Sequence, residues 1–151
     1  MGTVVQRTLG ATLLVVLVGG CASTPGGGVA VPGVDVPAAA ETVVSVFDGV
    51  FTAGQARDGE RTFGRVCAGC HNTTEFSGGR FRFRWVGQSV GDLFDVMSTT
   101  MPQARPGSLD PDSYAALAAY LLRMNEYPTG ETPLPSDLEA LRRIRIVEAA
   151  L

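Results

Sequence analysis

The sequence predicts an all-α domain with long loops, and three observations lead to this fold class. Apolar residues recur at helical spacing from residue 53 onward, directly after a threonine that fits a helix cap. The pair Asp110-Pro111 is typical of another helix start, with a capping residue before a proline in the first turn. Residues 72–89 show no sustained period and allow only a short extended piece at residues 80–85. Because loops of this length in a small domain usually wrap another group, the fold depends on more than its own core.

The composition indicates one small acidic domain. The chain has 151 residues, with 12 basic residues that are all arginine, 15 acidic residues and a formal net charge of −3. This length suits a single domain. The charge excludes a typical nucleic-acid-binding protein, which would carry a basic stripe or a high pI. Arg80, Arg82 and Arg84 cluster in the sequence, and a solvated edge of the domain is the simplest interpretation of them.

The N-terminal segment is typical of an export signal. Residues 1–20 carry one basic residue and then an apolar run that is shorter than the ~20 residues a helix needs to span a bilayer. The stretch Val18-Gly19-Gly20-Cys21 resembles the bacterial lipobox, in which the cysteine becomes the acylated first residue of the mature protein. We therefore expect residues 1–20 to be a lipoprotein signal peptide and Cys21 to be lipidated. An ordinary signal peptide and an uncleaved anchor are the alternatives.

The segment that follows the signal predicts a flexible linker. Residues 21–42 are rich in proline and glycine and show neither a helical nor a strand period. A segment of this length reaches several tens of ångströms when it is extended, so a tethered domain would be able to visit its partners. The folded domain is expected over residues 43–151.

The first expected helix runs over residues 53–66 and leads into Cys67. Thr52 and Gln55 fit a capping box at its start. Its apolar positions recur at helical spacing, and they are Ala56, Gly59, Phe63 and Val66. A glycine inside a helix costs about 1 kcal/mol relative to alanine. Gly59 therefore indicates that another helix crosses closely at this position.

Three further helices are expected. One covers residues 90–98, and the next begins at Asp110-Pro111 and ends before Pro128. A short last helix begins at Ser136, where Glu139 completes another capping box. The apolar faces of the first two are Leu93, Val96 and Met97, and then Tyr114, Leu117, Ala118, Leu121 and Leu122.

The pentapeptide Cys67-Ala68-Gly69-Cys70-His71 is the attachment pattern of c-type haem. The chemistry requires this spacing, because two thiols add to two vinyl groups at one edge of the ring and the next residue brings an imidazole to the iron. A redox disulfide between Cys67 and Cys70 is a competing interpretation, but it expects a βαβ setting with a helix after the motif. A zinc site needs four ligands, and the chain has neither a second such cysteine pair nor a second histidine.

The second axial ligand of such a haem is expected to be a methionine. His71 is the only histidine, and the soft donors that follow it are Met97, Met101 and Met124. Methionines commonly fill gaps in cores, and Met97 and Met124 fall on the core faces of expected helices. Pro102 disfavours the helical region for the residue before it, which presents Met101 from a loop. We therefore expect His71 and Met101 to fill both axial positions, which favours electron transfer over substrate chemistry.

These residues resemble the class I cytochrome c family over about residues 43–147. The resemblance rests on Gly59 and Phe63 before the haem motif, on Met101-Pro102 after it, and on Tyr120 in the last core helix. It implies a cytochrome c fold of three to five helices around one covalently bound haem. It also implies that the helix of Gly59 and Phe63 crosses the helix of Tyr120.

The loop after the motif departs from that family. Many class I cytochromes orient the haem histidine with a proline carbonyl, but no proline occurs between His71 and Met101. Some other carbonyl must accept the imidazole N–H, since such partners fix the orientation of the ring. Trp85 is a candidate contact for the haem propionates, with simple packing as its alternative role. The arginines at 80, 82 and 84 are weaker candidates for the same contact.

A narrower resemblance concerns the monohaem cytochromes associated with quinoprotein alcohol dehydrogenases. It rests on short strings at residues 48–52, 100–102, 106–109 and 119–122 and on Asn125. It implies that the protein accepts electrons from a periplasmic or membrane dehydrogenase and passes them towards a terminal oxidase.

The sequence thus predicts a membrane-tethered monohaem electron carrier rather than an enzyme, with redox proteins as partners. Its expected location is outside the cytoplasm, on a membrane facing the periplasm or the cell exterior. Two other functions stay open. One is a cytochrome subunit of a larger membrane enzyme complex, and the other is a haem enzyme or sensor with an open sixth position.

Overall fold

The computed structural model describes residues 43–148 of the chain. The expected signal peptide, the linker over residues 21–42 and the lipidated Cys21 lie outside the described residues. The helices of the described part are α1 (Ala53–Thr62), α2 (Gly78–Trp85), α3 (Val90–Thr100), α4 (Pro111–Met124) and α5 (Leu138–Arg142). This arrangement confirms the predicted all-α class. None of the described helices combines the length and the apolarity needed to cross a bilayer.

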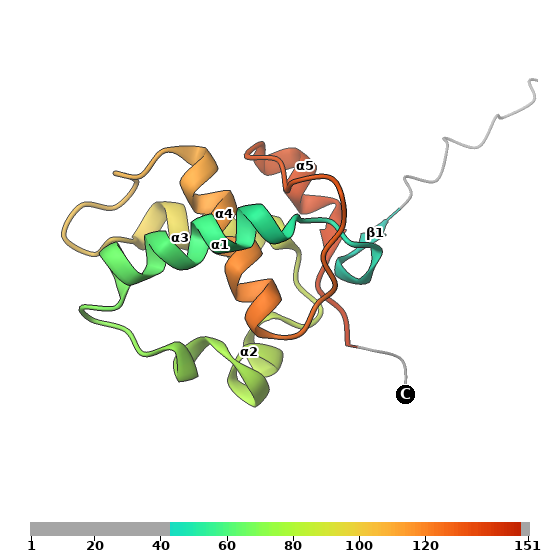
Figure 1. Cartoon of the computed structure of the whole chain (residues 1–151), viewed down its shortest axis with the longest axis horizontal. Helices are drawn as coiled ribbons and strands as arrows, with labels where there is room; N and C mark the ends of the chain where they lie inside the picture. The colour runs from blue at the N-terminus through green and yellow to red at the C-terminus, as the bar shows by residue number, and fades with distance from the viewer. Residues whose placement is uncertain (1–42, 149–151) are drawn as a thin grey trace, which may run out of the picture. The chain divides into compact units, whose positions relative to one another are not determined.

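Short elements join and frame the helices. They are β1 (Val44–Ser45), the 3₁₀ helices η1 (Val46–Asp48) and η3 (Thr73–Phe76), the π-helical segment η2 (Phe63–Cys67) and β2 (Ile144–Arg145). β1 and β2 pair in parallel, with Val44 opposite Ile144. Figure 1 shows that this pair brings the first and the last described segments of the domain side by side.

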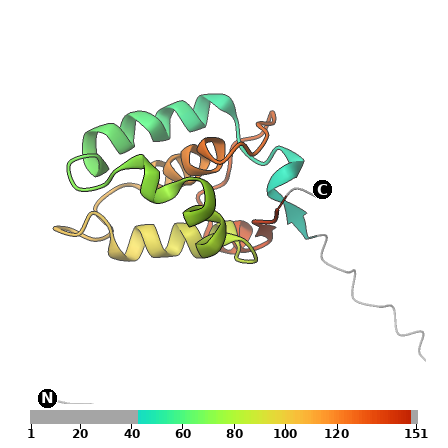
Figure 2. The same ribbon diagram turned by 90° about the horizontal axis from the view of Figure 1, so that it is seen from below.

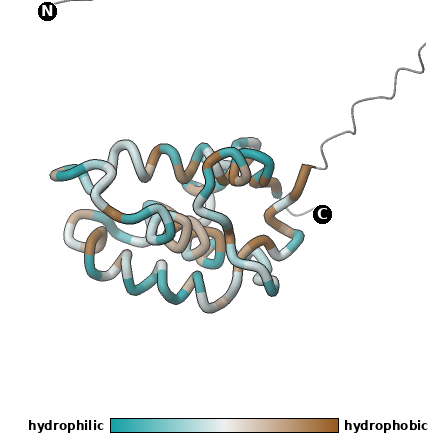
Figure 3. Tube along the Cα trace, turned by 90° about the horizontal axis from the view of Figure 1, so that it is seen from above, coloured by the Kyte–Doolittle hydropathy of each residue, from teal (hydrophilic) through white to brown (hydrophobic). Residues whose placement is uncertain are grey.

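The core is built around α4, which lies between α1 and α3 (Figure 2). Covered on both sides, α4 buries almost every residue from Tyr114 to Leu122, including the whole apolar face expected from the sequence. Figure 3 shows the contrast, because α4 is mostly white to brown whereas α1 is mostly teal and white. Much of the burial that stabilises the domain is therefore concentrated in one helix, which anchors the others.

The crossing of α1 and α4 confirms the close approach expected at Gly59. A Cβ atom at this position would lie 1.9 Å from the carbonyl oxygen of Ala116 and 2.9 Å from the Cβ of Tyr120. The backbones of the two helices are thus in contact here, and only glycine leaves room for this. One turn further on, the ring of Phe63 packs against that of Tyr120 with centroids 5.6 Å apart.

The prediction of a loop with an extended piece at residues 80–85 is wrong. This segment forms α2, and the 3₁₀ helix η3 precedes it. The segment shows no helical period, because arginine and phenylalanine alternate in it. Phe81 is buried at 1% exposure, but Phe83 is 95% exposed, so a single phenylalanine anchors the helix to the core.

The two capping boxes expected from the sequence differ from the caps that the structure forms. The hydroxyl of Thr52 does accept the Gln55 N–H at 3.1 Å, but the Gln55 amide exchanges hydrogen bonds of 2.9 and 2.8 Å with the backbone of Leu134 instead of returning to the cap. The last helix is capped by Asp137 and not by Ser136, because the Asp137 carboxylate reaches the Ala140 N–H at 2.8 Å. In the first case a long-range partner outcompetes the local one.

The helix expected over residues 53–66 changes its winding before it reaches Cys67. α1 ends at Thr62, and the chain continues as the π-helical segment η2. Because a π turn holds more residues than an α turn, it shifts the later residues around the helix axis. Val66, assigned to the buried face from the sequence, is consequently 37% exposed.

We predict that Gly59→Ala lowers the free energy of unfolding by at least about 3 kcal/mol, because the new methyl group meets backbone rather than a movable side chain. The measurement is denaturant unfolding of the purified full chain. Gly54→Ala is the matched control in the same helix, since its nearest neighbours would lie 3.7 and 3.9 Å from the added Cβ. Equal stability of the two variants would contradict the close crossing.

Candidate functional site

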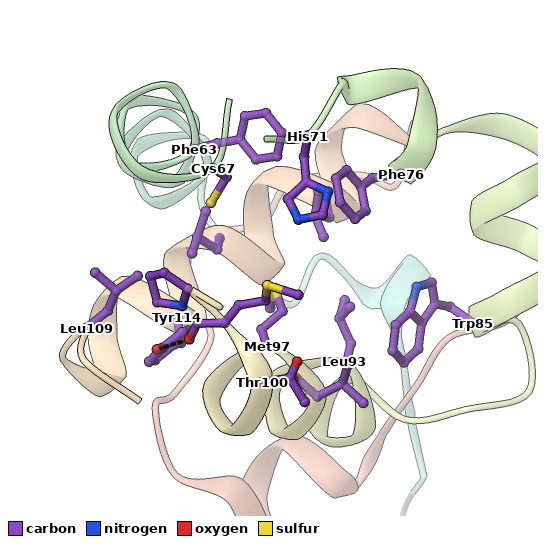
Figure 4. A pocket seen from close by; sticks show the side chains of 15 residues that line it. Phe63, Cys67, His71, Phe76, Trp85, Leu93, Met97, Thr100, Leu109 and Tyr114 are labelled. Atoms are coloured by element: carbon purple, nitrogen blue, oxygen red, sulfur yellow. Dashed lines mark hydrogen bonds between the residues drawn. The ribbon is translucent and has the colours of Figure 1, made fainter. Parts of the chain in front are cut away.

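A largely apolar cavity opens between η2, α3 and α4, with further walls from η3 and α2. It encloses about 720 Å³ of empty space, part of which is open to solvent. Its walls are formed by Phe63, Cys67, His71, Phe76, Trp85, Leu93, Val96, Met97, Thr100, Met101, Pro102, Leu109, Tyr114, Leu117 and Leu121. Figure 4 shows His71 entering from one side and Leu93, Met97 and Thr100 of α3 facing it from the other.

The cysteine and histidine residues of the motif are gathered by one tight turn at the end of η2. The Cys67 carbonyl accepts the N–H groups of Cys70 at 3.1 Å and of His71 at 2.9 Å. The side chain of Cys67 lines the cavity, and burial raises the pKa of its thiol. Cys70 is exposed and is not among the residues that line the cavity. Within the described residues both cysteines are free thiols.

His71 has a carboxylate partner for its ring. Its Nδ1 lies 3.2 Å from Oε2 of Glu75, and Oε1 of the same carboxylate accepts the Asn72 backbone N–H at 2.8 Å. The Asn72 N–H, the His71 ring and, more weakly, the charge of Arg80 hold the pKa of Glu75 below its ordinary value. An ionised carboxylate only accepts hydrogen bonds, so Nδ1 is the ring nitrogen that donates, and Nε2 is the one that has a lone pair when the ring is neutral. A neutral imidazole nitrogen with a lone pair is what an iron ligand requires.

This contact corrects the expectation that a backbone carbonyl accepts the imidazole N–H. The acceptor is the side chain of Glu75, four residues after the histidine. The sequence did contain a signal for it, because Asn72 and Glu75 have the spacing of a capping box, which the structure forms at the start of η3. The capping box places the carboxylate beside the preceding residue, His71.

Two methionines reach the cavity, and they are Met97 and Met101. Met97 packs against the core, as the sequence predicts, and it also lines the cavity. Met124 packs against the core and is not among the lining residues. Met101 ends α3 in an extended conformation, with φ −128° and ψ 151°. The Tyr114 hydroxyl donates a hydrogen bond of 2.6 Å to the Met101 carbonyl and so fixes this turn against α4.

Trp85 lines the cavity, whereas the three clustered arginines do not. The Arg84 guanidinium carbon lies 5.2 Å from the centre of the Trp85 ring, which is a cation–π contact. Arg82 is exposed and faces Glu148, with 3.8 Å between Nε and the carboxylate. The arginines therefore form the solvated edge that the sequence suggested, and Trp85 is the aromatic residue of α2 at the cavity.

Asn125 ties the loop after the haem motif to α4. Its Oδ1 accepts the Gly78 N–H at 2.9 Å, and its Nδ2 donates to the carbonyls of Phe76 and Leu121, each at 2.8 Å. Phe76 in turn packs against His71, with ring centroids 5.3 Å apart. The sequence singled out Asn125 only by resemblance, and the structure gives it the role of a clamp on this wall of the cavity.

The residues at the cavity fit a haem. A flat and mostly apolar ring suits walls of phenylalanine, leucine and valine, and the lining offers an imidazole and two thioethers, which are groups that bind haem iron. Cys67 stands at the edge of the same cavity, where a thioether bond to the ring would form. With Nδ1 of His71 beside Glu75, Nε2 is the ring nitrogen left for a metal.

Comparison with known families agrees with this fit. Residues 54–121 match the family described as "Cytochrome C oxidase, cbb3-type, subunit III". No curated protein and no solved structure gave a significant match. The matched segment contains the whole motif from Cys67 to His71, Met101 and Tyr120. Residues 54–121 thus resemble a cytochrome c domain, and the helical structure of the described residues is consistent with the cytochrome c fold. Such a domain implies a haem c cofactor and a role in electron transport.

We predict that Asn125→Ala opens the loop over residues 72–78 and lowers the free energy of unfolding by about 2–3 kcal/mol, since three hydrogen bonds are lost. Amide hydrogen exchange of Gly78, together with denaturant unfolding, measures both effects. Thr99→Ala is the control, because it removes one exposed hydrogen bond within α3 and should cost no more than about 0.5 kcal/mol. Unchanged exchange at Gly78 would contradict the clamp.

Proposed function

We propose that this protein is a single-electron carrier whose one haem c is bonded to Cys67 and Cys70 and ligated by His71 and Met101. The observation that carries the proposal is the cavity itself, where an imidazole and a methionine thioether converge beside Cys67 within a cytochrome c domain. Bound there, the haem supplies a one-electron couple between ferric and ferrous iron.

The attachment needs no reagent beyond the haem. Each thiol adds across one vinyl group, so that a carbon–sulfur bond forms and the thiol hydrogen passes to the other vinyl carbon. Cys67 is already at the cavity wall, and the turn that carries Cys70 follows it directly. Two such bonds would make the ring a permanent part of a core that is small without it.

The two axial ligands favour a carrier over an enzyme. With His71 on one side and Met101 on the other, no axial position is left for a substrate or a gas. The support for Met101 over Met97 is its fixed extended backbone, which ends α3 and is held by Tyr114. The exposed residues Val96 and Thr100 mark the open side of the cavity, where an electron would enter or leave over a short path.

The proposed carrier is tethered to a membrane through a lipid on Cys21. Two or more acyl chains hold a protein stably on a bilayer, whereas one gives only marginal binding. Residues 22–42 would give the domain the reach to visit its partners. In this role the protein is exported and takes electrons from a periplasmic or membrane dehydrogenase, such as a quinoprotein alcohol dehydrogenase, for delivery towards a terminal oxidase.

A second candidate function is supported by the family match. The matched family is described as subunit III of a cbb3-type cytochrome c oxidase. By that analogy the chain would be the cytochrome subunit of a larger enzyme. Solubilisation in mild detergent and affinity purification separate the two functions, because a subunit brings a large catalytic chain with it in constant ratio.

We predict that the oxidised protein shows the weak far-red absorption band of a methionine–iron bond and that Met101→Ala removes it. The variant should also bind carbon monoxide readily after reduction, because its sixth position is open. Met97→Ala is the matched control, since it shortens another methionine of the same cavity and should leave the band in place. Loss of the band in Met97→Ala alone would assign the ligand to Met97, and a colourless protein would overturn the proposed function.

We predict that Cys21→Ala moves the protein from the membrane fraction to the soluble fraction of an expressing cell that exports it. The visible spectrum should be unchanged, because the substitution lies outside the haem domain. Mass spectrometry of the mature wild-type protein should show a chain that begins at Cys21 and carries acyl groups. A variant that remains in the membrane fraction after a salt wash would argue against the lipid tether.

A further inference from the structure

Glu75, the hydrogen-bond partner of the His71 ring, is held in place by the capping box at the start of η3. Asn72 begins η3, and its side chain accepts the Thr74 N–H at 3.0 Å. In return Glu75 accepts the Asn72 N–H through Oε1. This reciprocal pair leaves Oε2 of Glu75 directed at Nδ1 of His71, 3.2 Å away.

The imidazole is held on two sides. The Glu75 carboxylate contacts Nδ1. The ring of Phe76 packs edge-on against the imidazole ring, with an interplanar angle of 66°. The segment that carries both residues is tied to α4 through Asn125. The rotation of the His71 ring is thereby restricted before any ligand is bound, with Nδ1 occupied and Nε2 left for coordination.

We propose that Glu75 is a positioning residue that lowers the reduction potential of the haem by donating negative charge to His71 through this hydrogen bond. The inference rests on the proposed function, because it requires His71 to be an iron ligand. A carboxylate hydrogen-bonded to the far nitrogen of a ligating imidazole makes the ligand more basic. A more basic ligand stabilises ferric over ferrous iron, which lowers the potential.

A carboxylate should raise the basicity of the imidazole more than the neutral backbone carbonyl that the sequence led us to expect. Hydrogen bonds to an ionised acceptor are roughly twice as strong as those between neutral groups. Solvent moderates the effect here, since the side chains of His71 and Glu75 are 30% and 42% exposed. Arg80, the positive charge near this carboxylate, also opposes it.

The test is the midpoint potential of Glu75→Gln, measured by spectroelectrochemical titration of the haem-loaded full chain. Glutamine is suited to this turn because it also completes capping boxes, but it has no charge and only one oxygen. We expect a tenfold shift of the redox equilibrium towards the reduced form, which is about 59 mV for a one-electron couple. The far-red band should persist, because Met101 is untouched.

Glu60→Gln is the matched control. It removes the same unit of charge from an exposed glutamate of α1 that pairs with Arg123 at 2.6 Å. We expect its potential to change far less than that of Glu75→Gln. Equal shifts in the two variants, or none in either, would overturn the inference while leaving the carrier function intact. A wild-type protein without haem or without the band would overturn the function instead.

A second measurement covers the case in which Glu75→Gln fails to load haem. In the reduced wild-type protein, proton NMR should show the Nδ1–H of His71 in slow exchange with water and close to the side-chain protons of Glu75. A rapidly exchanging Nδ1–H in a protein that retains the far-red band would overturn the role of Glu75. No substitution is needed for this readout.

Discussion

The contact of two backbones at Gly59 is the constraint on which the rest of the domain depends. Because α1 and α4 touch there, the chain that leaves α1 delivers Phe63 and Cys67 to one wall of the cavity. α4 supplies Leu117 and Leu121 to the same cavity. A wider crossing would fill the space between the helices with side chains and move the cysteine away from the wall. The missing side chain of one residue therefore determines where a cofactor is able to bind.

Around that crossing, the cavity is held by polar contacts of individual loops rather than by a large core. Asn125 fastens the segment before α2, and Tyr114 fastens the turn after α3. Each contact uses a side chain of α4, or of the residue that ends it, to bind backbone groups of a neighbouring segment. In a domain of this size a buried hydrogen bond to backbone restrains a loop without adding apolar bulk. α4 thus serves both as the packed centre and as the anchor of the cavity walls.

The sequence predicted those features that local spacing determines. Asp110-Pro111 marked the start of α4 correctly, and the helical face of Tyr114 was the buried one. The sequence failed where a distant partner decides the outcome. Gln55 lies three residues after Thr52, which suggested a capping box, but the Gln55 amide donates to the Leu134 carbonyl across the fold. Residues 72–89 showed no helical period, since nothing local indicates that the single buried residue Phe81 docks a helix.

The candidate site also contains features that local sequence predicts and features that only the folded structure shows. The proline that follows Met101 singled this methionine out. The structure adds Met97 to the cavity, because the apolar face of α3 is turned inward. For His71, the sequence led us to expect a backbone carbonyl as the acceptor of the ring N–H. The capping-box spacing of Asn72 and Glu75, directly after the motif, was the signal for the carboxylate that lies there instead. In the proposed carrier the two sides of the iron then act in opposite directions, since a thioether raises the potential and a carboxylate on the imidazole lowers it. In that carrier the potential would reflect the balance between the Met101 turn, which lines the cavity, and the Glu75 turn, which contacts His71.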